Sequence, residues 1–123
     1  MDLHASDLRP FLPAQDFELS KQFYLALGAQ LEWSDAQLAL FNLGGARFYV
    51  QRYHVKAWAE NCMLHITVQD AARCHAQIAE LLQSGRFPGA RVAPPKLEPY
   101  GALVTYVWDP VGVLLHLAEW QAS

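Results

Sequence analysis

The sequence repeats itself at an offset of about 54 residues, and this repeat limits what the chain can fold into. Asp16 and Asp70, and Leu27 and Leu81, are related by this offset, while Gly45 and Gly112 each precede the last strand of a half. A chain of 123 residues has the length of one ordinary domain. We therefore expect a single domain over residues 1–123, built from two similar halves at about 8–53 and 62–120.

Each half reads as one strand, one helix and three further strands. Aspartate is a favoured N-cap, so Asp16 and Asp70 mark helix starts, and Gly28 and Gly85 mark helix ends. Alternating stretches bounded by turn residues predict strands at 8–14, 29–33, 37–42, 46–51, 63–68, 91–93, 103–108 and 113–119. Residues 52–61 are expected to be a connector, and the rest of 86–99 mostly loop. This order predicts an α+β fold of two βαβββ modules.

Side-chain alternation gives each predicted strand two different faces. One face is plainly apolar, as at Leu64 and Ile66 or Leu115 and Leu117, and suits packing under a helix. The opposite face is mixed, and it carries the candidate ligand-binding residues Phe11, Arg47, Tyr49, Gln51, His65, Tyr106, Trp108 and His116. Such a face is solvated, covered by a partner copy, or the lining of a small-molecule cavity. The density of aromatic residues favours the cavity.

Charge and composition narrow the partners. The net charge of −3 and the absence of a basic run argue against nucleic-acid and membrane-surface partners. No apolar stretch is long enough for a transmembrane helix, and the first residues do not resemble a signal peptide. Cys62 and Cys74 form no disulfide framework and read as reduced, structural thiols. We expect a cytoplasmic protein.

Several short motifs occur in a characteristic order. They are LPAQD at 12–16, Phe23-Tyr24, Leu27-Gly28, the VQD of 68–70, and DPVG at 109–112 before the last strand. In order and spacing these motifs resemble the glyoxalase/bleomycin-resistance/dioxygenase (vicinal oxygen chelate) superfamily, over residues 8–120. The resemblance implies βαβββ modules whose curled mixed sheets form an open cup, and a homodimer. The superfamily contains both metal enzymes and metal-free binders such as bleomycin-resistance proteins.

The resemblance also implies where metal ligands would lie. The corresponding positions hold Arg9, Tyr49, Met63 and His116, and only His116 is an ordinary ligand for a divalent ion. A catalytic site needs about three protein ligands. We therefore expect no metal and no other cofactor. An unusual site formed by His65, His116 and Gln51 is the alternative.

These observations lead to three hypotheses. The first is a metal-independent small-molecule-binding protein, resembling bleomycin-resistance proteins, that binds an aromatic or cationic organic ligand. The alternative is a divergent metal-dependent lyase or dioxygenase that uses His65 and His116. The third is a structural or regulatory dimer without a ligand. No nucleophile stands beside a base in the sequence, so no residue is assigned a catalytic role.

Overall fold

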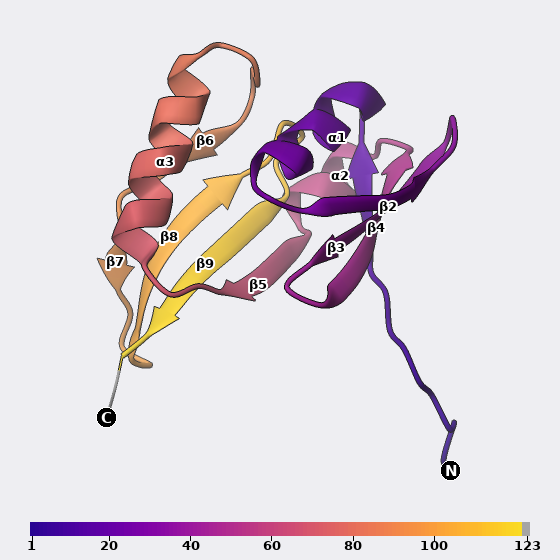
Figure 1. Cartoon of the computed structure of the whole chain (residues 1–123), viewed down its shortest axis with the longest axis horizontal. Helices are drawn as coiled ribbons and strands as arrows, with labels where there is room; N and C mark the ends of the chain where they lie inside the picture. Colours follow the sequence, from indigo (N-terminus) through magenta and orange to yellow (C-terminus); the bar gives the residue numbers. More distant parts are fainter. Residues whose placement is uncertain (122–123) are drawn as a thin grey trace. The chain divides into compact units, whose positions relative to one another are not determined.

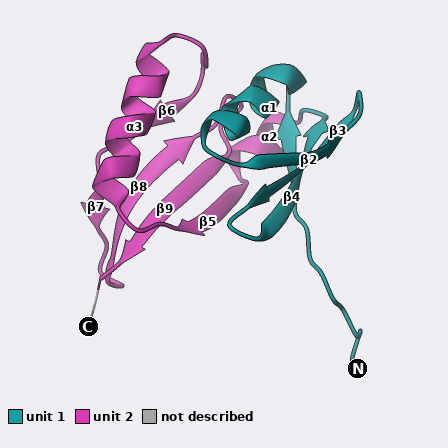
Figure 2. Cartoon of the chain, in the orientation of Figure 1, with its two compact units in different colours: residues 1–54 teal, residues 55–123 magenta. Residues whose placement is uncertain are grey.

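The chain forms two compact units, residues Met1–His54 and Val55–Ser123, which Figure 2 shows in different colours. The computed structural model describes residues 1–121. The sequence repeat predicted halves at about 8–53 and 62–120. Each unit has its own mixed sheet and its own main helix packed against that sheet (Figure 1).

The first unit has one helix and a four-stranded sheet. In chain order its elements are β1 (Phe11–Ala14), α1 (Phe17–Ala26), β2 (Gln30–Ser34), β3 (Leu38–Leu43) and β4 (Ala46–Arg52). The strand order in the sheet is β1-β4-β3-β2. β1 pairs with β4 in parallel, whereas the other pairs are antiparallel.

The second unit repeats this topology with additions. Its elements are α2 (Lys56–Glu60), β5 (Met63–Thr67), α3 (Ala71–Gln83), β6 (Arg91–Val92), β7 (Lys96–Leu97), β8 (Ala102–Trp108) and β9 (Leu114–Trp120). The strand order is β5-β9-β8-β6, and β7 also pairs with β8. The parallel pair β5–β9 takes the place of β1–β4 in the first unit. The predicted α+β fold with two βαβββ modules is confirmed.

The two helices begin in the same way because the repeat supplies the same cap. The Asp16 carboxylate accepts a hydrogen bond from the Leu19 amide at 3.1 Å, and that of Asp70 accepts one from the Arg73 amide at 2.9 Å. Side-chain caps of this kind satisfy amide groups that have no partner within the helix. Gly28 follows the first helix at a φ of 102°, a conformation that glycine adopts without strain. The predicted helix boundaries are therefore confirmed.

The predicted strand faces are also confirmed. Leu12 and Val50 of the first unit and Leu115 of the second are fully buried, while Phe48 is nearly so. In β5, exposed residues alternate with half-buried ones, as a sheet with one covered face requires. The helices therefore cover the apolar faces, and the mixed faces lie on the other side of each sheet.

Three boundaries differ from the prediction. The stretch 52–61, expected to be a connector, contains α2, whose N-cap Val55 makes no side-chain cap and so leaves no sequence signal. The expected loop at 86–99 contains β7, a two-residue strand paired with β8. The first strand begins at Phe11 rather than residue 8, consistent with the missing amide of Pro10.

Candidate functional site

The predicted site residues fall into two sets, one in each unit. The first unit contains Phe11, Arg47, Tyr49 and Gln51, and the second contains His65, Tyr106, Trp108 and His116. In each set the residues lie on the helix-free face of the sheet, as strand alternation predicted.

In the first unit, cross-strand pairing places four apolar or aromatic residues in one row. Phe11 pairs with Tyr49, Tyr49 with Leu40, and Leu40 with Trp33. The rings of Phe11 and Tyr49 are stacked, with centroids 4.7 Å apart. Phe11 is 45% exposed and Trp33 is 49% exposed. The row is a strip of accessible ring surface, suited to stacking against a flat molecule.

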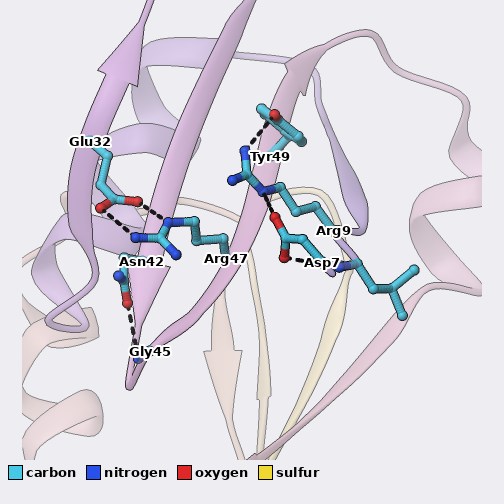
Figure 3. Close-up of polar contacts among 8 residues, drawn as sticks. Asp7, Arg9, Glu32, Asn42, Gly45, Arg47 and Tyr49 are labelled. Atoms are coloured by element: carbon cyan, nitrogen blue, oxygen red, sulfur yellow. Dashed lines mark hydrogen bonds and ion pairs between the residues drawn. The ribbon is translucent and has the colours of Figure 1, made fainter. Parts of the chain in front are cut away.

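Two polar contacts flank this strip, and both are drawn in Figure 3. Arg9 donates to the Tyr49 hydroxyl at 2.9 Å and to the Asp7 carboxylate at 2.6 Å. Arg47 donates to both carboxylate oxygens of Glu32, at 2.5 and 3.2 Å. This hydrogen bonding lowers the pKa of Glu32. A ligand that uses Arg47 therefore has to share its guanidinium with Glu32.

The second unit has a corresponding row on β5, β9 and β8. His65 pairs with His116, and His116 pairs with Tyr106. The Tyr106 and His116 rings meet edge to face, with centroids 5.0 Å apart. The Nε2 atom of His116 is buried and has no hydrogen-bond partner among residues 1–121. Buried polar atoms are nearly always satisfied, so this atom gains a partner from a ligand only if the side chains that cover it move aside.

Three residues that the sequence analysis missed complete this face. Trp120 lies beside both His65 and Tyr100, with ring centroids 5.7 and 5.6 Å apart respectively. Burial raises the pKa of Tyr106 to about 12, and a hydrogen bond with Glu98 adds to the shift. Tyr106 therefore keeps its proton near neutral pH and acts as a hydrogen-bonding group rather than a base. Strand alternation points to Trp120, but Glu98 and Tyr100 lie in a loop without a sequence signal.

Trp108 and Gln51 lie toward the ends of these faces. Trp108 pairs with Arg91 of β6, and the Arg91 guanidinium lies over the indole ring at 4.1 Å from its centroid. Gln51 is half-buried between its register partners Pro13 and Leu38. Arg91 was not predicted as a site residue, although it lies in the short strand that was expected at 91–93.

The side chains at the implied metal-ligand positions do not fit a metal. The Arg9 guanidinium donates a hydrogen bond to the Tyr49 hydroxyl. A positively charged side chain therefore occupies one of the four implied ligand positions and contacts a second one. Met63 is 61% exposed. Within residues 1–121, no three His, Cys, Asp or Glu side chains form a group that could hold an ion. Of the alternative site, His65 and His116 are neighbours in the β5–β9 ladder, and Gln51 belongs to the first unit.

Both cysteines are free thiols and half-buried. Burial raises the pKa of Cys62 and Cys74 above the ordinary value for a thiol. A raised pKa lowers the fraction of reactive thiolate near neutral pH. These properties support the interpretation of both residues as structural thiols.

The half-buried position of His116 leads to a testable pH dependence. Burial lowers the pKa of His116, and the neighbouring His65 lowers it further. Below the ordinary histidine value of about 6.5, the unfolded chain therefore binds more protons at this position than the folded one. The free energy of unfolding should therefore fall as the pH drops below about 6.5. Urea unfolding at pH 8 and pH 5 should show the loss, and His116→Gln should reduce it whereas His75→Gln on α3 should not.

Comparison with known proteins places the fold. No protein-family profile and no curated protein sequence matches the chain. A bleomycin-binding protein from Streptomyces verticillus, solved with copper(II)-bleomycin, matches with a TM-score of 0.77 and 22% identity, over 98% of this chain and 100% of its own. The antibiotic-binding protein TnmS3 from Streptomyces sp. CB03234 has a TM-score of 0.78 and 18% identity, with 98% and 100% covered.

A third solved structure is that of an enzyme. The lactoylglutathione lyase from Agrobacterium tumefaciens matches with a TM-score of 0.67 and 15% identity, and 96% of each chain is covered. The three similarities confirm the fold that the sequence motifs indicated. In the part of the chain that the structure describes, no helix is both long and apolar enough to cross a bilayer.

Proposed function

Because the chain has the glyoxalase/bleomycin-resistance fold, we propose that it is a metal-independent protein that binds an aromatic or cationic organic molecule. Two similar structures are described as bleomycin-binding and antibiotic-binding proteins. They support small-molecule binding as the activity. The ligand class and the metal independence rest on the residues of this chain.

One observation carries the proposal: the helix-free faces of both sheets present aromatic rings at equivalent register positions. Tyr49 and His116 each lie four residues after the corresponding glycine of the repeat, and they pair with Phe11 and His65 respectively. A solvated face has no need of rings at these positions. Stacking of aromatic rings contributes about 0.5–1.5 kcal/mol for each pair beyond the burial of area.

His116 offers a polar contact for the ligand. Its Nε2 atom is buried and has no partner in the described part of the chain, and an unsatisfied buried polar atom costs about 1–3 kcal/mol. A ligand that forms a hydrogen bond with this atom removes that cost on binding. Since burial lowers the pKa of His116, the neutral imidazole predominates near neutral pH. A cationic ligand therefore meets no histidine charge there.

Metal independence is proposed because the side chains at the implied ligand positions are poor ligands for a divalent ion. Arg9 cannot ligate an ion, and its hydrogen bond occupies the Tyr49 hydroxyl. His65 and His116 are adjacent in the parallel ladder and are the only pair that supports the alternative of a divergent lyase or dioxygenase. The proposal also includes a homodimer and a cytoplasmic location. The exposed apolar side chains of Met63 and Leu97 and the two free thiols support these.

A thermal-shift experiment tests the proposal. Metal-free bleomycin and a panel of planar aromatic cations should raise the melting temperature, increasingly with ligand concentration, because a ligand that binds the folded state stabilises it. Tyr49→Ala and His116→Ala should each weaken the binding of any hit about tenfold, as expected when a stacked ring or a buried hydrogen bond is lost. His75→Ala on α3 is the control and should bind like wild type.

Two outcomes would contradict the proposal. If both variants bind the hits as tightly as wild type, the ligand does not lie on the mixed faces. If the purified protein holds one equivalent of a divalent ion that disappears in His116→Ala, the alternative metal-dependent function is favoured.

A further inference from the structure

A shallow pocket lies at one end of β8, within the second unit. Its volume is about 460 Å³, and it is lined by Glu60, Gly89, Arg91, Trp108 and the turn residues Pro110, Val111 and Gly112. Of these residues, only Trp108 was considered as a ligand contact from the sequence. The pocket is therefore a feature that the mixed-face proposal does not explain.

Two walls of this pocket are close-packed and fixed. A Cβ atom on Gly89 would lie 2.8 Å from the Pro110 carbonyl oxygen, so the loop before β6 touches the turn and only glycine fits. The turn itself is held by the buried Asp109, whose carboxylate accepts from the amides of Val111 and Val113 at 2.9 and 3.0 Å. Rigid walls of this kind reduce the entropy that a ligand has to overcome on binding.

The pocket presents a positioned cation. The Arg91 guanidinium lies over the Trp108 indole at 4.1 Å from the ring centroid. Among residues 1–121, no carboxylate lies within 4 Å of it to form an ion pair. Stacking occupies a face of the planar group, whereas its N–H donors project along the edges. Those edges match the two oxygens of a carboxylate.

Glu60 is the other charged residue of the lining. Its carboxylate is 3.8 Å from Lys56 in an exposed ion pair, which neutralises part of its charge. Glu60 disfavours a bare anion but accepts a hydrogen bond from a ligand N–H. The pocket therefore combines one site for an anionic group, one acceptor and an aromatic ring beside them.

We infer that Arg91 binds the carboxylate of an aromatic organic ligand in this pocket, with Trp108 holding the guanidinium in place. This inference deepens the proposed function and rests on it, because Trp108 belongs to the mixed face as well as to the pocket. The ligand class is then narrowed from an aromatic or cationic molecule to an aromatic molecule that carries an acid group.

Three probes of equal shape and different charge test this inference: benzoate, benzamide and benzamidinium. In a ¹H–¹⁵N NMR titration of the whole chain, benzoate should shift the amides of Val111 and Gly112 and the Arg91 Nε–H signal. Benzamide and benzamidinium should shift them much less. Arg91→Gln should weaken benzoate binding about tenfold, the loss expected for a hydrogen bond to a charged group at an accessible site. Arg91→Lys should show an intermediate loss, since lysine keeps the charge without the planar fork.

Matched variants separate this subsite from general effects of charge. Arg86 also lies over an aromatic ring, that of Phe87 at 5.0 Å, but outside the pocket, so Arg86→Gln should leave benzoate binding unchanged. Glu60→Gln should strengthen it, because a nearby negative charge is removed. Unfolding midpoints of all variants check that each one folds.

The possible outcomes distinguish the two proposals. Equal shifts with all three probes, a preference for benzamidinium, or no shift at all would overturn the inference. If binding of a thermal-shift hit requires Tyr49 and His116 but binding of benzoate does not require Arg91, the proposed function stands and the inferred subsite is wrong. If binding of benzoate requires Arg91 while Tyr49→Ala and His116→Ala change the binding of no ligand, the subsite stands. The proposal that the ligand binds on the mixed faces is then wrong.

Discussion

Replacing Phe41 with alanine should lower the free energy of unfolding by about 3–5 kcal/mol, because the change removes buried apolar surface and leaves a cavity. Phe41 lies in β3 and is fully buried. Its ring is stacked on that of Phe48 at 5.5 Å and lies 6.1 Å from that of Tyr24. A domain of this size is stable by only about 5–15 kcal/mol, so the loss is a large share of the total. Urea unfolding followed by circular dichroism measures it.

Trp33→Ala is the matched control for this prediction. Trp33 is a larger aromatic residue in the same sheet, but it lies on the helix-free face and is 49% exposed. We expect Trp33→Ala to cost less than about 1 kcal/mol, as is usual for an exposed cross-strand contact. Equal losses in the two variants would show that the faces of this sheet have been assigned the wrong way round.

The parts of the fold that the sequence predicts depend on local rules. An aspartate cap and a glycine stop can be read from single residues, and Asp16, Asp70 and Gly28 all have the predicted roles. Strand faces follow from alternation, because successive side chains point to opposite sides. The repeat then applies the same topology to both halves. For this reason the rows through Tyr49 and His116 could be predicted without the structure.

The contacts of the site were harder to predict, because they depend on irregularities. The ladder between β2 and β3 shifts register between Leu31 and Trp33, and the intervening Glu32 reaches Arg47. Alternation alone gives no means of predicting such a bulge. Arg47 was therefore predicted as a contact for a ligand, without the carboxylate that it binds in the structure.

Loops and very short elements account for the other differences. β6, which was expected at 91–93, and β7, which was not predicted, have two residues each, too few to show by alternation which face a side chain takes. Both strands pair with β8, and the pairing of β6 brings Arg91 onto Trp108. Glu98 follows β7, and its side chain forms a hydrogen bond with that of Tyr106 on β8. These polar contacts of the second unit thus come from a segment that, apart from the short strand expected at 91–93, was interpreted as a loop rich in glycine and proline.

The turn between β8 and β9 is the second place where a substitution should cause a large loss of stability. Asp109→Ala should lower the free energy of unfolding by about 2–4 kcal/mol, since an unsatisfied buried donor costs about 1–3 kcal/mol. Asp109 is fully buried, and its carboxylate accepts hydrogen bonds from the amides of Val111 and Val113. Alanine offers no acceptor to either amide. Urea unfolding at pH 7 gives the size of the loss, and Asp109→Asn should recover part of it because the amide oxygen still accepts.

Asp35→Ala shows whether burial causes the size of this effect. Asp35 makes the same kind of contact in the turn between β2 and β3, where its carboxylate accepts from the amides of Gln37 and Leu38 at 2.8 and 2.9 Å. Asp35 is exposed, so water replaces the lost acceptor and the cost should be about 1 kcal/mol or less. Two similar losses would mean that hydrogen-bond geometry outweighs burial. A much larger loss for Asp109 would show that its turn is held by the buried carboxylate, which also fixes the wall of the Arg91 pocket.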